Sequence, residues 1–425
     1  MNINQPPASP RQNFPARAVP VESIATSPSL DAPPNPPVQA ADRQPGSPST
    51  QGSAVAGRLR AALPVLVEGS LPLHAAIVDK DYARVVDHLA AGMGVNQCDA
   101  NRTTPLMLAV QANDHEIVQK LFEYGAAASV NFQDGHGNTV LHLAVTSGDL
   151  SMLNIVVGTA GDALDINATA RRNMTPLHLA ARIGDGDKVA VLVHSGRLRP
   201  NLRNLDSKTA LHLAAQDGHV NAVRTLMQVN GIDRNCLTVS GASALHMAAS
   251  SGYVDIVTML AAASPADVNR PDGQGKTALH RAAQAGHPAA ILALLNVQGI
   301  NPNAATRFGD TPLMLAAGRD TREHDDVVRA LLTAPGINVN QPDADQYPAL
   351  HRAVLSGTVE MVGALLSHPG VDPAAALPLL QFPGQVRDRI LPLYRVARGV
   401  PAHVSDAHFL AAELVHDDDM AFQEQ

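Results

Sequence analysis

The chain has 425 residues, which allows about three domains of ordinary size or one extended repeat array. It contains 7 Phe, 5 Tyr and no Trp, so its core must be built from small and aliphatic residues, which favours closely packed helices and disfavours an aromatic-rich β-sandwich. Its formal charge is -8 without a basic block, which excludes nucleic acid and anionic membranes as leading partners because their phosphates require Lys and Arg.

Residues 1–56 are predicted to form a disordered leader. Within residues 1–50 lie 12 of the 31 prolines and six serines, Phe14 is the one aromatic residue, and no acidic residue precedes Glu22. Such a segment cannot bury enough apolar surface to offset its chain entropy. Its composition resembles the export signals of Gram-negative type III secretion substrates, especially the effectors of plant pathogens. An ordinary disordered tail is the alternative interpretation.

From about residue 57 a tetrapeptide recurs nine times, and its fourth position repeats at intervals of 33 to 37 residues. The nine copies are Leu71–His74, Thr104–Met107, Thr139–His142, Thr175–His178, Thr209–His212, Ser243–His246, Thr277–His280, Thr311–Met314 and Pro348–His351. Repeats of this period predict a solenoid.

Each copy of the tetrapeptide predicts the start of a short helix. Thr or Ser stands first in seven of the nine copies, where its hydroxyl can accept a hydrogen bond from a free backbone N–H as an N-cap. In three of these, Pro follows at a position where its missing donor costs nothing. Gly stands six residues after the His position in most units, as at Gly184 and Gly218, and predicts the end of that helix.

A second helix and an Asn turn complete each unit. Apolar residues at Val220, Val223, Leu226 and Met227 have the spacing of a helix with one buried face. An Asn follows in the turn at positions 96, 131, 167, 201, 235, 269, 303 and 340. Because Asn tolerates turn geometry and can bond its own backbone, it is expected to fix the loop that leads to the next cap.

This order of helix, Gly, helix and Asn turn behind a Thr-Pro-Leu-His motif resembles the ankyrin repeat, and the resemblance covers residues 57–373. It implies an all-α solenoid of about nine helix-turn-helix units with β-hairpin fingers. It also implies that the fingers and the inner helices form a concave protein-binding face. Leu71 and Pro348 replace the cap in the first and last units, as expected of terminal units that each cover an exposed end.

The repeated histidines could indicate a metal site or a proton relay. They occupy one repeat position at 74, 142, 178, 212, 246, 280 and 351. Packed helices lie about 8–10 Å apart, so successive histidines are too distant to share a zinc ion. We therefore predict a structural role, in which each ring bonds the backbone of a neighbouring loop. Cys98 and Cys236 lie four units apart and are predicted to be unpaired small residues of a reducing interior.

Residues 374–425 are predicted to form a helical C-terminal cap and an acidic tail. His403, Asp406, His408 and His416 could form a metal cluster there, but their spacing matches no ligand motif. The chain has no apolar run of membrane-spanning length and no phosphate-binding, nucleophile-elbow or zinc-protease motif. We therefore predict no catalytic residue, metal or cofactor, and no membrane partner.

The ankyrin resemblance places contact residues at fixed distances from each His position. Residues of this kind in four units combine Arg or Lys with large apolar side chains, the usual composition of an interface hot spot. They are Arg171, Arg172, Met174, Arg182 and Ile183, then Leu205, Lys208 and Gln216, then Arg307, Phe308 and Arg319, and finally Tyr347 and Leu355. Solvated loop side chains are the alternative interpretation for each of them.

The resulting hypothesis is a monomeric, non-catalytic protein-binding module. The leading interpretation is a bacterial type III effector that enters the host-cell cytoplasm and binds a host protein with its concave face. A cytosolic scaffold or adaptor without an export role is the alternative, and an enzyme is the third interpretation.

Overall fold

The computed structural model describes residues 71–356, 358–372 and 391–396. All of them belong to one compact unit, Ala62–Gln425. The predicted leader and the four C-terminal residues named as a possible metal cluster lie outside the described residues.

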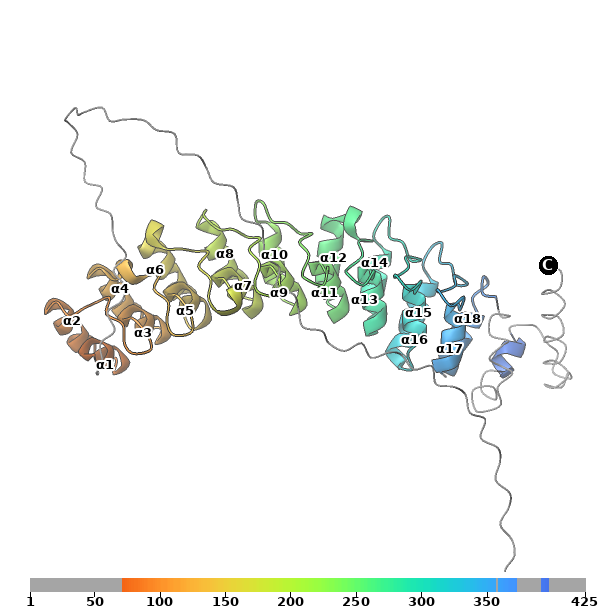
Figure 1. The fold of residues 1–425 in the computed structure, drawn as a ribbon, viewed down its shortest axis with the longest axis horizontal. Helices are drawn as coiled ribbons and strands as arrows, with labels where there is room; N and C mark the ends of the chain where they lie inside the picture. The colour runs from red at the N-terminus through yellow and green to blue at the C-terminus, as the bar shows by residue number, and fades with distance from the viewer. Residues whose placement is uncertain (1–70, 357, 373–390, 397–425) are drawn as a thin grey trace, which may run out of the picture. The chain divides into compact units, whose positions relative to one another are not determined.

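Eighteen α-helices follow one another in sequential pairs within the described residues, and they form two adjacent rows (Figure 1). The first row consists of the odd-numbered helices α1 (Pro72–Val78), α3 (Pro105–Gln111), α5 (Val140–Thr146), α7 (Pro176–Ile183), α9 (Ala210–Gln216), α11 (Ala244–Ser251), α13 (Ala278–Ala285), α15 (Pro312–Ala317) and α17 (Ala349–Ser356). The second row consists of the even-numbered helices α2 (Tyr82–Ala90), α4 (His115–Glu123), α6 (Leu150–Ala160), α8 (Gly186–His194), α10 (Val220–Met227), α12 (Val254–Ala263), α14 (Pro288–Leu295), α16 (Arg322–Leu332) and α18 (Val359–Leu366). Each helix contacts its partner in the pair and its neighbours along the row.

The odd-numbered helices begin and end as their sequences predict. Thr175 is extended, its hydroxyl accepts a hydrogen bond from the backbone N–H of His178, and Pro176 opens α7. Gly184 then takes the left-handed conformation, with φ 85°, and ends the helix. The even-numbered helices α4, α6 and α8 use an Asp cap instead, as at Asp185, whose carboxylate accepts two backbone N–H groups.

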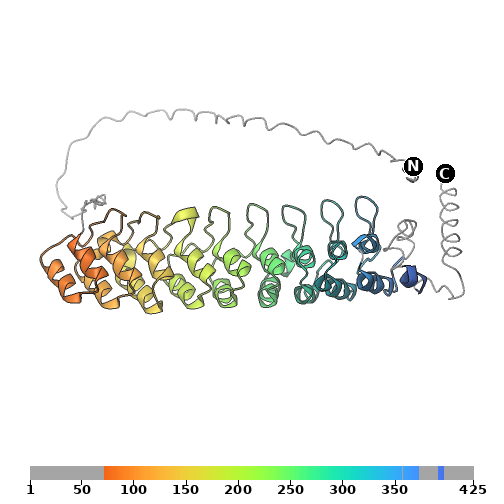
Figure 2. The same ribbon diagram turned by 90° about the horizontal axis from the view of Figure 1, so that it is seen from below.

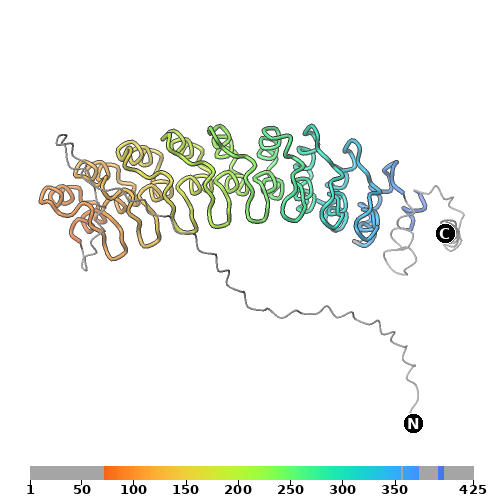
Figure 3. The backbone as a smooth tube through the Cα atoms, turned by 45° about the horizontal axis from the view of Figure 1, so that its top comes forward, coloured from red at the N-terminus to blue at the C-terminus, as the bar shows by residue number. Residues whose placement is uncertain are grey.

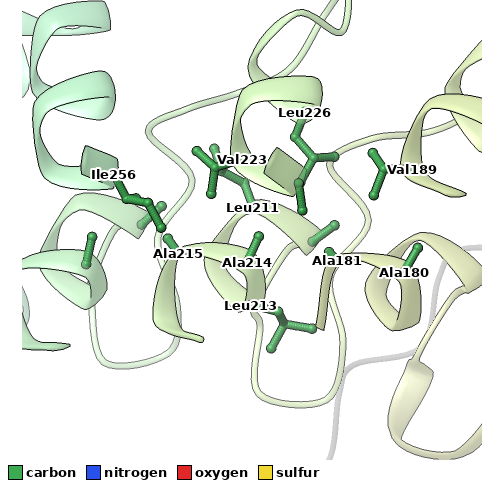
Figure 4. Packing of buried hydrophobic residues seen from close by; sticks show 14 of the residues in the cluster. Ala180, Ala181, Val189, Leu211, Leu213, Ala214, Ala215, Val223, Leu226 and Ile256 are labelled. Carbon is green, nitrogen blue, oxygen red and sulfur yellow. The ribbon is translucent and has the colours of Figure 1, made fainter. Parts of the chain in front are cut away.

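Small side chains allow the rows to pack closely. Ala180, Ala181, Ala214 and Ala215 are fully buried between neighbouring odd-numbered helices. The second row covers them with aliphatic side chains such as Leu226 (Figure 4). An apolar core built mainly of aliphatic side chains, with Phe122 and Tyr394 as its buried aromatic residues among those described, therefore runs along the array.

Eight loops, here called the first to eighth fingers, connect each helix pair to the next and stand in a row on one side (Figure 2). In each, the backbone N–H of the first residue donates to the carbonyl of the fifth, and in all but the third the N–H of the fourth residue also donates to the carbonyl of the first. The fingers are residues 99–103, 134–138, 170–174, 204–208, 238–242, 272–276, 306–310 and 343–347.

The predicted β-hairpins are not present as strands among the described residues, since the backbone bonds of each finger lie within its five residues and do not continue into a ladder. The short 3-10 helices are η1 (Ala126–Ser129), η2 (Gly161–Ala163), η3 (Arg171–Asn173) and η4 (Pro265–Asp267), of which η3 forms the tip of the third finger. The fourth residue of every finger has a positive φ, and four of these residues are Gly. This left-handed residue reverses the chain within the five-residue finger.

The fingers are joined by backbone hydrogen bonds in alternate pairs. Gly135 N–H donates to Asn101, Leu205 to Arg172, Gly273 to Ser240 and Ala344 to Phe308, over 2.8–3.1 Å. In the described structure no backbone bond joins the second finger to the third, the fourth to the fifth, or the sixth to the seventh. The tube view shows the fingers following one another along the array (Figure 3).

At the C-terminal side, the described segment 391–396 is helical. Its Leu391 and Tyr394 are buried, and Leu393 lies near Gly363 of α18. That residues 374–425 as a whole form a cap stays a prediction.

Candidate protein-binding site

The repeated histidines position the fingers. In the third unit, His142 Nδ1 accepts a hydrogen bond from the backbone N–H of Thr139, 3.2 Å away. A backbone N–H always donates, so the imidazole proton must be on Nε2, which donates to the carbonyl of Met174 at 3.0 Å. Met174 is the last residue of the third finger, so a ring buried in one unit fixes the finger that leads to the next.

The same bond recurs along the array. His74, His178, His212, His246 and His280 donate from Nε2 to the carbonyls of Thr103, Lys208, Ala242, Lys276 and Asp310, over 2.9–3.3 Å. The predicted structural role of these histidines is confirmed.

Burial favours the neutral form of five of these rings. It lowers the pKa of His142, His178 and His246, and it lowers the pKa of His212 and His280 to about 4. A protonated ring would have to give up its Nδ1 acceptor, so the finger geometry depends on the neutral tautomer.

Units that depart from the motif show what each atom does. Leu71 and Pro348 cannot cap, and Nδ1 of both His74 and His351 has no hydrogen-bond partner within the described structure. In two other units Met takes the His position, and its sulfur lies 3.5 Å from the N–H of Thr104 and 3.4 Å from that of Thr311. Met107 and Met314 therefore replace the acceptor but have no donor for the next finger.

The Asn turns link neighbouring units instead of bonding their own backbone, which corrects the expected contact. Nδ2 of Asn201 donates to the carbonyl of Gly231, and its Oδ1 accepts from Asp233 N–H. Asn269 and Asn340 each form the same two bonds with the turn of the unit that follows their own. The reason is the stacking distance, because the side chain reaches the equivalent turn of the next unit.

A second set of rings also joins units, and the repeat pattern of the sequence did not lead us to it. His219 and His287 each follow the Gly that ends an odd-numbered helix, and their Nε2 atoms donate to the carbonyls of Arg182 and Ser250. Each ring lies against the Gly of the preceding unit. A Cβ on Gly184 would be 2.3 Å from His219 Nδ1, so this Gly is needed for contact as well as for φ. The recurrent Gly-His pairs were the available signal.

The predicted basic patch is only partly free. Arg171 and Arg182 are exposed, but Arg172 forms an ion pair with Asp206, with Nη2 2.8 Å from Oδ2. Leu205 donates its N–H to the carbonyl of Arg172, so the fourth finger lies beside the third, as expected. Asp206 stands 34 residues after Arg172, which is why a single unit does not reveal this partner.

A second correction concerns Met174, which the resemblance places among the residues that contact a partner. Its side chain is buried, and its sulfur lies 3.5 Å from the amide nitrogen of Asn204 in the next finger. Ile183 and Leu205 remain exposed, by 45% and 64%. Lys208 is half-buried and donates from Nζ to the exposed Gln216 at 2.6 Å. The available surface here therefore consists of Arg171, Arg182 and their apolar neighbours.

The second predicted cluster lies on the last fingers. Arg307, Arg319 and Leu355 are exposed, and Phe308 is 73% exposed. Tyr347 stacks on His351 with ring centroids 3.9 Å apart and remains 45% exposed. Phe308 and Tyr347 belong to the seventh and eighth fingers, which are bonded to each other.

We call the exposed side chains of the eight fingers, with the C-terminal ends of the odd-numbered helices, the finger surface.

The free thiols of Cys98 and Cys236 are buried, and burial raises the pKa of both. Within the described residues, no group of three or more His, Cys, Asp or Glu side chains is placed to hold a metal ion. None of the helices in that part of the chain is long and apolar enough to cross a membrane.

Residues 73–170, 162–236, 226–306 and 279–376 match a family model described as ankyrin repeats in three copies. The nuclear factor NF-kappa-B p105 subunit of Gallus gallus is 33% identical over 111 residues, which are 26% of this chain and 11% of that protein. The B-cell lymphoma 3 protein homolog of Mus musculus is 31% identical over 134 residues, 30% of each chain. Protein lin-12 of Caenorhabditis elegans is 32% identical over 111 residues, 25% of this chain and 8% of that protein. The chain spans less than a third of the length of each of these relatives.

Proposed function

The chain belongs to the ankyrin-repeat family, and from this premise we propose that it is a non-catalytic module that binds a protein partner with its finger surface. Ankyrin repeats imply protein–protein interaction. We assign one repeat unit to each of the nine helix pairs, within the predicted array 57–373. The chain is proposed to act as a monomer.

The observation that carries this proposal is the set of large apolar side chains exposed on four of the eight fingers, the fourth, fifth, seventh and eighth. Leu205, Val239, Phe308 and Tyr347 are 64%, 82%, 73% and 45% exposed, whereas the other large apolar side chains of the array are mostly buried in its core. Exposed apolar residues beside Arg are typical of protein-binding surfaces. Six of the eight finger backbones, the first and the third to seventh, are fixed by the histidines beneath them, which reduces the ordering cost of binding.

A charge reversal tests the finger surface. The variant Arg171→Glu, Arg172→Glu, Arg182→Glu should lose the proteins that co-purify with the wild-type chain from candidate host extracts, while its circular-dichroism melt stays nearly unchanged. The matched control is Arg84→Glu, Arg224→Glu, Arg329→Glu, which reverses three exposed charges on the even-numbered helices α2, α10 and α16. Equal capture by both variants would show that this part of the finger surface is not the binding site.

We further propose that the partner is a host protein and that the chain is a type III effector delivered into the host-cell cytoplasm. The composition of residues 1–50 supports this proposal. Deleting residues 1–50 should abolish export of a fused reporter by a type III system and leave the melting temperature of the array unchanged. Undiminished export would favour the alternative, a cytosolic scaffold or adaptor, which the animal origin of the matched relatives also supports.

A further inference from the structure

A groove of about 370 Å³ lies between the sixth and seventh fingers, with Lys276, Arg307, Phe308 and Asp310 in its lining. The position of this groove follows from the sequence. At the other two junctions that lack a backbone bond, the side chain of the residue just before the earlier finger spans the junction. Gln133 donates to the carbonyl of Thr169, and Arg203 donates to that of Leu237. The equivalent residue before the sixth finger is Pro271, which has no side-chain donor, so no side-chain bond of this kind spans this junction.

Both walls of the groove are fixed from behind. The sixth finger is bonded to the fifth through Gly273 N–H and Ser240, and the seventh is bonded to the eighth through Phe308 and Ala344 N–H. The carbonyls of Lys276 and Asp310 also accept hydrogen bonds from buried His246 and His280. A ligand would therefore enter a preformed site with little ordering cost.

The groove is positively charged. Among the described residues that line it, Asp310 alone is acidic, and its carboxylate is bonded to Arg352 of α17. Lys276 donates from Nζ to the neutral Gln284, and no ion pair within the described residues involves Arg307. The positive charges of Lys276 and Arg307 therefore have no acidic partner among the described residues of this site. A carboxylate of a ligand can pair with them, and the planar Arg307 guanidinium can bind it with two hydrogen bonds.

Phe308 adds an apolar requirement. Its ring is 73% exposed, and its own backbone is fixed by the bond to Ala344. An apolar side chain packed on this ring would bury apolar area that is exposed to water in the unbound chain. The groove therefore offers an apolar contact and a carboxylate contact side by side.

We propose that this groove binds a linear peptide segment of a protein partner that carries Asp or Glu close to a large apolar side chain. The carboxylate pairs with Arg307 and Lys276, and the apolar side chain packs on Phe308. This inference rests on the proposed function, because it names the partner chemistry of one site on the finger surface.

The test uses peptides selected from a random phage-displayed library on the full chain. The enriched peptides should combine Asp or Glu with Leu, Ile or Phe. Labelled copies of them should bind the Arg307→Glu and Lys276→Glu variants at least about tenfold more weakly, measured by fluorescence polarisation. The matched control is Arg224→Glu, which reverses an exposed charge on α10 outside the finger surface, and it should leave the affinity unchanged.

A charge swap gives a positive readout. The double variant Lys276→Glu, Arg307→Glu should enrich peptides that carry Lys or Arg in place of the acidic residue, and a circular-dichroism melt should show that it folds. The proposal is overturned if no acidic and apolar consensus emerges, or if Arg307→Glu leaves binding intact. If the peptides lose affinity with Arg171→Glu and not with Arg307→Glu, the groove is not their binding site. Protein binding by the finger surface would then still be supported.

Discussion

The imidazole of His280 donates from Nε2 to the main-chain carbonyl of Asp310, 3.0 Å away in the following finger. The ring is fully buried, and its Nδ1 accepts the N–H of the Thr277 cap. One side chain thus completes the start of α13 and fixes the seventh finger, which forms a wall of the proposed groove.

Replacing His280 by Ala should lower the free energy of unfolding by roughly 1–3 kcal/mol, because the buried N–H of Thr277 loses its partner and the carbonyl of Asp310 keeps only its bond from Thr306 N–H. Urea unfolding followed by circular dichroism measures the loss. His136→Ala, at an exposed histidine of the second finger, is the control and should stay within about 0.5 kcal/mol of the wild type. A fully stable His280→Ala chain would contradict the structural role.

Met314→His should stabilise the array by about 0.5–1.5 kcal/mol. The new Nδ1 would accept the N–H of Thr311 where the sulfur now lies, and Nε2 would donate to the carbonyl of Tyr347, which has a lone pair left beside its bond from Asp343. The control is Met247→His, one residue after His246, which lies at no cap and should bring no gain in the same urea titration.

The array should lose stability on acidification from pH 6.5 to 4. The pKa of His212 and His280 is about 4 in the folded chain, against about 6.5 when unfolded. Between these values the unfolded state binds more protons, so unfolding becomes easier as the pH falls, by roughly 3 kcal/mol for each ring at pH 4. Urea midpoints measured at several pH values check the direction and the range.

The double variant His212→Met, His280→Met provides the control for this pH dependence, because Met already occupies the same position in two units. It should be less stable than the wild type at pH 7.5 and should lose less stability between pH 6.5 and 4. Parallel pH profiles for the two chains would show that other groups control the acid response.

Gly184→Ala should destabilise the array by roughly 2–4 kcal/mol, because the new Cβ would meet the His219 ring and the residue has a positive φ. Gly196→Ala isolates the second cause, since Gly196 also has a positive φ but a Cβ added to it would have no neighbour within 4 Å. We expect it to cost about 1–2 kcal/mol. Equal losses in thermal or urea unfolding would contradict the close contact between units.

The regular part of this fold could be predicted from single units. Caps such as Thr175 and terminators such as Gly184 act within a few residues, so their local pattern is sufficient. The role of His142 also followed, because a polar ring at a buried repeat position needs a partner in the neighbouring loop.

The remaining features depend on pairs of units. The ion pair of Arg172 with Asp206 and the contact of His219 with Gly184 join residues about 35 positions apart, and neither motif shows its partner alone. Met174 directly precedes the Thr175 cap, and the resemblance assigns that position to the binding face, whereas its side chain turns inward toward Asn204. The missing side-chain donor at Pro271 is evident only when several fingers are compared.

The alternate bonding of the fingers also sets how the array can be rebuilt. Removing one helix pair deletes one finger and leaves the finger bonded to it without that backbone bond, whereas intact pairs such as the fifth and sixth fingers, joined by Gly273 and Ser240, stay adjacent. Removing two repeats that carry a bonded pair of fingers takes out both partners together and leaves the other finger bonds in place. The module that can be removed or exchanged without breaking a finger bond is therefore a block of two repeats whose fingers are bonded to each other.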